Sequence, residues 1–98
     1  MDPNPPIDVY KEVLTAIVQR FIILIGDPAV RRARRVYSLQ LDDDGKVKGY
    51  QGDPMVIVQG LVIEYMTLLG PQALRLSQRA TAGTKAHHPE MKLPSLLA

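Results

Sequence analysis

The sequence IVQRFIILIGDPAVRRARR, residues 17–35, decides the fold expected for this chain because a similar stretch follows it. When Gly26 is set over Gly70, 44 positions later, LVIEYMTLLGPQALRLSQR (61–79) aligns with it without a gap. The aligned pairs include Phe21 with Tyr65, Ile17 with Leu61, Val18 with Val62, Leu24 with Leu68, Ile25 with Leu69 and Ala29 with Ala73. We interpret the two stretches as copies of one unit, a long helix followed by a tight turn and a short helix. The alternative is a chance similarity of two amphipathic helices.

Each unit carries signals that start and stop helices. In the first unit, Asp8 is a suitable N-cap for a helix ending near Ile25, and a second helix is expected over residues 28–36, with Asp27 as its N-cap. In the second unit, helices are expected over residues 55–69 and from residue 71 to about residue 80. The glycine that ends each long helix suits a left-handed turn.

Between the two units, the hydrophobic pattern changes from the helical period to the two-residue alternation of β-strands. Apolar and polar residues alternate in VYSLQL (36–41), which is the first expected strand. DDDG (42–45) supplies the turn, and KVKGY (46–50) is the returning strand of a β-hairpin. The predicted fold is therefore mostly α with a small β-hairpin, an α+β fold. Two pseudo-repeated helix-turn-helix hairpins, in the order αα-ββ-αα, would pack as a bundle.

This pattern also predicts how the chain is divided. The segments are an extended N-terminal arm (1–7), a single helical domain (8–80) and a flexible C-terminal tail (81–98). Within the domain, the first repeat covers about 8–36, the hairpin 37–51 and the second repeat about 53–80.

The composition bounds the class of protein. The 98 residues suit one small domain, and 46% hydrophobic with 22% charged residues is typical of a globular chain. The absence of cysteine excludes disulfides and cysteine-ligated zinc in this sequence and suits a cytoplasmic location. No signal peptide is recognised, and the apolar runs fall short of the ~20 residues that span a membrane.

Four arginines crowd into five positions of the second predicted helix: Arg31, Arg32, Arg34 and Arg35. They are the candidate partner-binding face, and they are expected to point away from the core. The repeat pairs two of them with Arg75 and Arg79 but leaves Arg32 and Arg34 unmatched, so a specific role would rest on those two. The partner could be an acidic protein surface, nucleic acid or a membrane surface, or the face could simply be solvated.

No residue pattern indicates catalysis, and no cofactor or metal is expected. The acidic turn lacks the outer ligands of a calcium loop, because Gln40 and Gln51 stand where acids are needed. His87 and His88 lie in the predicted tail and form no preorganised site. Glu64 aligns with Arg20, so we expect a structural ion pair between these two side chains across the pseudo-twofold axis.

The two long helices are more apolar than one small domain can cover. Self-association is therefore expected through an apolar patch of four side chains, Ile22, Ile23, Val56 and Ile63. The sequence favours a non-catalytic protein–protein interaction or oligomerisation module, an adaptor or accessory subunit that forms a homodimer. The alternative function is a small nucleic-acid-binding protein that uses the basic helix. The apolar tail motif LPSLL (93–97) is a further candidate for partner contact.

Overall fold

The computed structural model of the protein describes residues 9–97 and is mostly helical with a small antiparallel sheet, which confirms the predicted α+β class. The elements, in order, are α1 (Val9–Ile25), α2 (Asp27–Ala33), β1 (Gln40–Leu41), β2 (Val47–Gly49), α3 (Pro54–Leu69) and α4 (Gln72–His87). The predicted N-terminal arm and the Asp8 cap lie outside the described residues.

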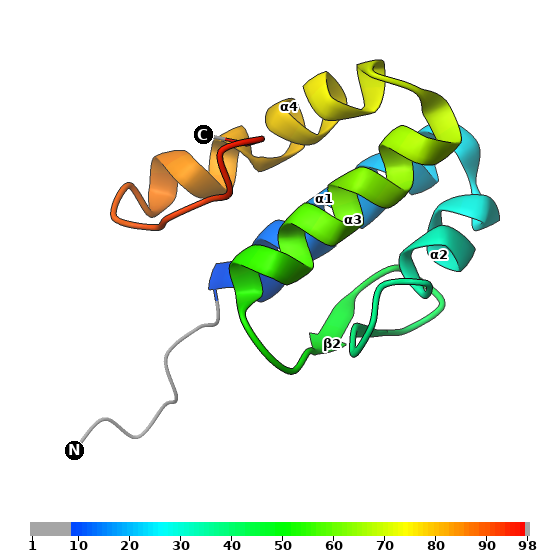
Figure 1. Cartoon of the computed structure of the whole chain (residues 1–98), viewed down its shortest axis with the longest axis horizontal. Helices are drawn as coiled ribbons and strands as arrows, with labels where there is room; N and C mark the ends of the chain where they lie inside the picture. The colour runs from blue at the N-terminus through cyan, green and yellow to red at the C-terminus, as the bar shows by residue number, and fades with distance from the viewer. Residues whose placement is uncertain (1–8, 98) are drawn as a thin grey trace.

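The two long helices α1 and α3 form the centre of the fold. They lie side by side, with α4 across one side of the pair and α2 with the hairpin on the other (Figure 1). Their inward side chains recur at helical spacing and are buried. The buried residues are Val13, Leu14, Ile17, Val18 and Phe21 on α1, and Ile57, Val58, Leu61, Val62 and Tyr65 on α3.

An aromatic pair closes the middle of this core. The rings of Phe21 and Tyr65 stack with their centroids 4.1 Å apart and an interplanar angle of 20°. The Tyr65 hydroxyl donates a hydrogen bond of 2.7 Å to the carbonyl of Ala29, which ties α3 to α2. Burial raises the pKa of Tyr65 well above its ordinary value, so the hydroxyl remains a donor.

Glycines make the two turns between consecutive helices. Gly26 and Gly70 have φ of 73° and 88°, and each donates its N–H to a carbonyl of the preceding helix. These angles favour glycine because a Cβ is strained there. Asp27 is the first residue of α2 and does not cap it, whereas Asp53 caps α3 by accepting a 2.9 Å hydrogen bond from the N–H of Met55.

The hairpin is present, but its strands are short. Asp42 organises the turn, because its Oδ1 accepts hydrogen bonds from the N–H groups of Asp44 and Lys46. These bonds, that of Lys46 above all, hold the pKa of Asp42 below its ordinary value. At the open end, the Ser38 hydroxyl donates to the carbonyl of Gln51 and accepts from its N–H, which holds the two ends of the hairpin together.

The prediction of a flexible tail over residues 81–98 is wrong, because residues 81–97 continue α4 and then pack against the helices. Helix α4 continues to His87, seven residues beyond the expected end near Ala80, and stops before Pro89. Residues 80–87 lack the large apolar side chains that mark a buried helix face, because small side chains pack between α4 and α1. Ser77 and Thr81 are buried, and their hydroxyls bond to carbonyls of their own helix.

Residues 88–97, which we call the strap, fold back over α1 and α4 (Figure 1). The Tyr10 hydroxyl on α1 donates to the carbonyl of Lys92 at 2.8 Å, and Gln78 on α4 donates to that of Leu96 at 3.0 Å. Leu93 and Leu97 are buried in the core cluster. The apolar tail motif is therefore part of the core and does not form a free partner-binding segment.

Candidate functional site

Glu64 on α3 forms ion pairs with two of the four clustered arginines. One carboxylate oxygen, Oε1, lies 3.4 Å from Nη1 of Arg32 and 3.6 Å from Nε of Arg35. The expected pair with Arg20 is wrong, because Arg20 is exposed on α1 whereas Glu64 faces α2, the helix packed on that side of α3. The alignment matched the two positions but could not show which neighbour each side chain faces.

The four arginines do not form one free basic face. Arg32 turns toward α3 and its side chain is only 20% exposed, which corrects the expectation that all four point away. Arg34 pairs with Asp43 of the hairpin turn, with Nη2 2.8 Å from Oδ1. Arg31 is exposed and has no ion-pair partner within residues 9–97. The two arginines that the repeat left unmatched are thus bound by carboxylates of the same chain.

Glutamine in place of Glu64 is expected to lower the free energy of unfolding by about 1 kcal/mol, because a half-buried carboxylate that serves two arginines is lost. Arg20→Gln is the matched control and should change it by less than about 0.5 kcal/mol, as exposed substitutions do. Chemical denaturation measures both. An equal loss in the two variants would mean that Arg20 does support Glu64.

An uncovered apolar surface runs along the outer side of α3. Val56 is 64% exposed and Ile63 is 45% exposed, and Gly60 lies between them. Tyr37, 88% exposed, stands beside Val56 and Gly60 at a pocket of about 310 Å³ that is also lined by Arg35, Val36, Ile57 and Glu64. We call Tyr37, Val56, Gly60 and Ile63 the α3 apolar face.

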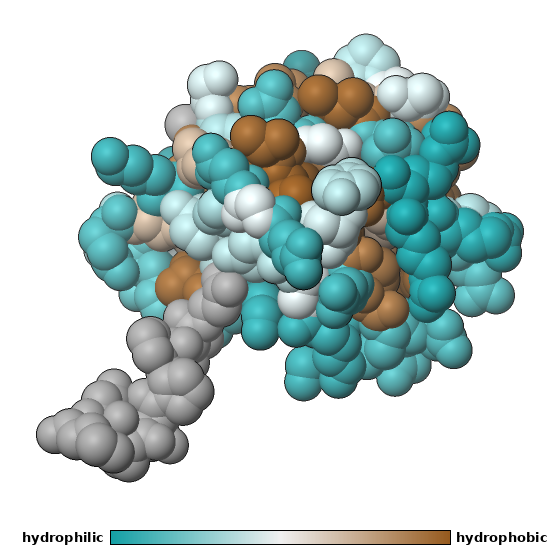
Figure 2. All heavy atoms as spheres, turned by 60° about the horizontal axis from the view of Figure 1, so that its bottom comes forward, coloured by the Kyte–Doolittle hydropathy of each residue, from teal (hydrophilic) through white to brown (hydrophobic). Residues whose placement is uncertain are grey.

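Figure 2 shows hydrophobic atoms lying open between hydrophilic ones on the side of the molecule that carries the hairpin and α2. The helical spacing in the sequence places Gly60 on the same side as Val56 and Ile63, but sequence reasoning missed Tyr37 as a member of this surface. Only tertiary packing places Tyr37 beside them.

The two α1 members of the predicted patch have different environments. Ile22 is half-buried beneath the hairpin turn, so close to Gly45 that a Cβ there would collide with Ile22 Cδ1. Ile23 is 79% exposed but does not line the pocket beside Val56. The structure therefore leaves Ile23, Val56 and Ile63 uncovered and brings Ile22 into the fold.

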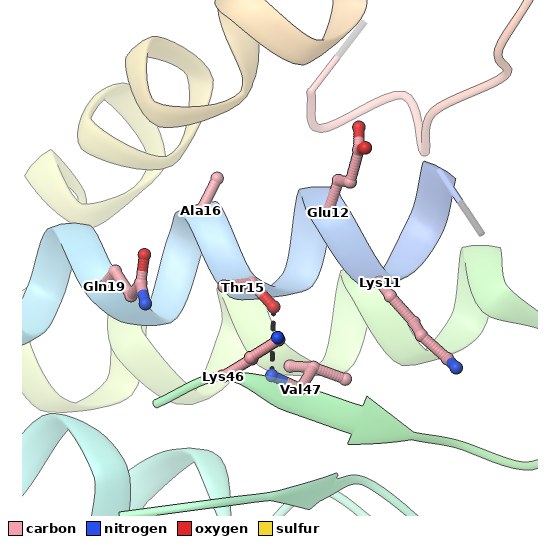
Figure 3. A pocket seen from close by; sticks show the side chains of 7 residues that line it. All are labelled: Lys11, Glu12, Thr15, Ala16, Gln19, Lys46 and Val47. Atoms are coloured by element: carbon pink, nitrogen blue, oxygen red, sulfur yellow. Dashed lines mark hydrogen bonds between the residues drawn. The ribbon is translucent and has the colours of Figure 1, made fainter. Parts of the chain in front are cut away.

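A second hollow, of about 370 Å³, lies between α1 and the hairpin (Figure 3). A 3.0 Å hydrogen bond from the N–H of Val47 to Thr15 Oγ1 joins its two walls. The other lining side chains come from α1 and β2 or its approach: Lys11, Glu12, Ala16, Gln19 and Lys46. The hollow therefore lies where β2 docks against α1.

Within residues 9–97, no group of three or more His, Asp or Glu side chains is placed to hold a metal ion. His88 lies 3.5 Å from Glu12 and 3.9 Å from Glu90, an arrangement that holds the strap against α1. No helix in this part of the chain has both the length and the apolar character needed to cross a membrane. No known protein family, curated protein or solved structure matches the chain.

Proposed function

We propose that this protein is a non-catalytic protein–protein interaction module that forms a twofold homodimer through the α3 apolar face. The observation that carries the proposal is the exposure of Tyr37 and Val56 at one hollow, together with that of Ile63, two helical turns after Val56 on α3. Leaving such side chains in water forfeits about 1.5–3 kcal/mol for each one that a partner would bury. A contiguous patch of this kind usually marks an interface.

The spacing along α3 favours a second copy of the chain as the occupant. Val56 and Ile63 are seven residues apart, two helical turns, and Gly60 lies near their midpoint. If two α3 helices cross antiparallel with the twofold axis near Gly60, Val56 of each copy meets Ile63 of the other. A twofold interface requires this reciprocal pairing. The missing side chain at Gly60 lets the helix axes approach to about 8 Å.

The charged residues beside the α3 apolar face include one of each sign, so two copies of this surface can be complementary to each other. Arg35, whose side chain is 65% exposed, and Glu64, 28% exposed, border the pocket at Val56. A twofold copy can place each charge near its opposite, whereas an acidic or basic partner would meet one unfavourable group. The alternative of nucleic-acid binding is less favoured, because Asp43 of the hairpin turn pairs with Arg34, and Asp27 and Asp43 line the hollow beside Arg31.

The same proposal includes descent of the α1–α2 and α3–α4 units from one repeated hairpin. This descent is supported by the similar structural environments of aligned positions in the two units. Gly26 and Gly70 both have positive φ, Ala29 and Ala73 are both fully buried, and Phe21 stacks on its aligned partner Tyr65. The alignment pairs Gly60 with Ala16 and Ile63 with Gln19, so the outward side of α3 corresponds to the side of α1 that carries Ala16 and Gln19. Of these two sides, only the one on α3 is strongly apolar.

Sedimentation equilibrium tests the dimer. We expect a homodimer with a micromolar dissociation constant, and Val56→Asp should weaken it at least about 100-fold, because dimerisation would bury a charge without a partner. Ile23→Asp is the matched control, equally apolar in the original and more exposed, and it should leave the dimer unchanged. Far-UV circular dichroism must show that both variants remain folded.

Glycine substitutions give a second, independent arm. Gly60→Leu should block the close approach of the helices, whereas Gly83→Leu on α4 is the control, since a Cβ at Gly83 meets nothing within 4 Å. A monomer at about 100 μM would refute the dimer. Loss of the dimer in Ile23→Asp but not in Val56→Asp would move the interface to α1 and overturn the proposal.

A further inference from the structure

Three arginines line one small pocket beside α2. Arg31, Arg32 and Arg35 surround a space of about 170 Å³ whose remaining walls are Pro28 and Leu68. Arg31 and Arg32 lie on α2, Arg35 follows two residues after its end, and Leu68 brings α3 into the wall of the same pocket. The pocket is separate from the α3 apolar face except that Arg35 borders both.

The pocket holds more positive charge than the chain neutralises. Glu64 Oε1 serves both Arg32 and Arg35. Arg31 has no ion-pair partner in the described part of the chain, residues 9–97. Three positive charges and one negative charge therefore leave an excess of two. We propose that this pocket binds a doubly charged oxyanion, the phosphate monoester of a modified side chain on a partner protein.

The chemistry of the walls favours a phosphate ester over other anions. Guanidinium groups donate paired hydrogen bonds that match phosphate oxygens, and a phosphate ester carries about −1.5 to −2 charges above its pKa of about 6. That charge matches the excess in the pocket, whereas one carboxylate would neutralise half of it. Pro28 and Leu68 supply apolar surface beside the charged centre, suited to the peptide that carries the phosphate.

The surroundings disfavour a continuous polyanion such as DNA. Beyond Arg31 lies another hollow, of about 470 Å³, which is lined by Asp27 and Asp43 together with Arg34. Arg34 is held by Asp43, and Asp44 of the same turn is exposed. A nucleic-acid backbone that entered at the arginine pocket would meet these carboxylates next, while a single phosphate group would not.

Arginine Nε–H signals in ¹H–¹⁵N spectra test the proposal, with inorganic phosphate added to the full chain at constant ionic strength. We expect saturable shifts at Arg31, Arg32 and Arg35, and at least about tenfold weaker binding in Arg31→Gln. Arg75→Gln, an exposed arginine on α4, is the matched control and should leave the affinity unchanged. Shifts that do not saturate, or that chloride reproduces, would overturn the site.

A peptide arm identifies the source of the phosphate. A short phosphoserine peptide with apolar flanking residues should bind at least about tenfold more tightly than its unphosphorylated form, and more tightly than inorganic phosphate. Equal affinity for both peptides overturns the assignment. Tighter binding of a DNA duplex, with shifts at Arg34 and Arg20, also overturns it in favour of nucleic acid. Because Arg35 borders both pockets, the phosphate titration is repeated with the Val56→Asp variant, whose shifts at Arg31 and Arg32 report the site in the absence of the dimer.

Discussion

Replacing Phe21 by alanine is expected to lower the free energy of unfolding by about 3–5 kcal/mol, a large part of the stability of a domain this size. Phe21 is fully buried and stacks on Tyr65 at the contact between α1 and α3. The rigid helix backbones cannot close the space that the ring leaves, so a cavity adds to the lost burial. Urea denaturation followed by circular dichroism measures the change.

Two further variants show that the effect comes from packing. Tyr65→Phe keeps the ring but leaves the carbonyl of Ala29 without its donor, and it should cost about 1–2 kcal/mol. Tyr37→Ala removes a ring that is exposed and should cost less than about 0.5 kcal/mol. If Phe21→Ala cost no more than Tyr37→Ala, the aromatic stack would not be part of the folded core.

The double substitution Leu93→Ala and Leu97→Ala is expected to lower the free energy of unfolding by about 3 kcal/mol. Both side chains are buried at the core, and one buried leucine contributes about 2–5 kcal/mol. The total is smaller than twice that range, because the strap can detach locally when its anchors are gone. The variant should also become sensitive to limited proteolysis near Pro89.

Ser95→Ala is the control within the strap, because Ser95 is exposed between the two anchors. It should leave both the stability and the proteolysis pattern unchanged. Proteolytic removal of the strap from the native protein without a fall in melting temperature would contradict this prediction. It would restore the flexible tail that the sequence suggested.

The sequence predicted the parts of the fold that depend on local chemistry. The helical periodicity, the glycine turns at Gly26 and Gly70 and the DDDG turn lie where residue types alone dictate the backbone. The end of α4 could not be found in this way. Its last turns have small residues such as Thr81, whose burial depends on how closely α1 approaches.

The candidate site was predicted less well than the fold because it depends on which helices are neighbours. Glu64 was correctly singled out as an acid within an apolar helix, but its partners come from α2 and the turn that follows it, which the linear alignment could not indicate. Ile22 was expected to be uncovered, and the hairpin turn at Gly45 covers it. The exposure of Val56 and Ile63 could be anticipated, because no predicted element was left to cover them.

The strap also affects the order in which the molecule can form. It is synthesised after the helices that it covers, and the bond from Tyr10 to Lys92 joins groups 82 residues apart in sequence. A growing chain can therefore assemble α1, α2 and α3. The part of the core that Leu93 and Leu97 cover stays exposed until the ribosome has added these two residues. Because contacts between distant residues slow folding, closure of the strap should be a late step, and the nascent chain exposes apolar surface until then.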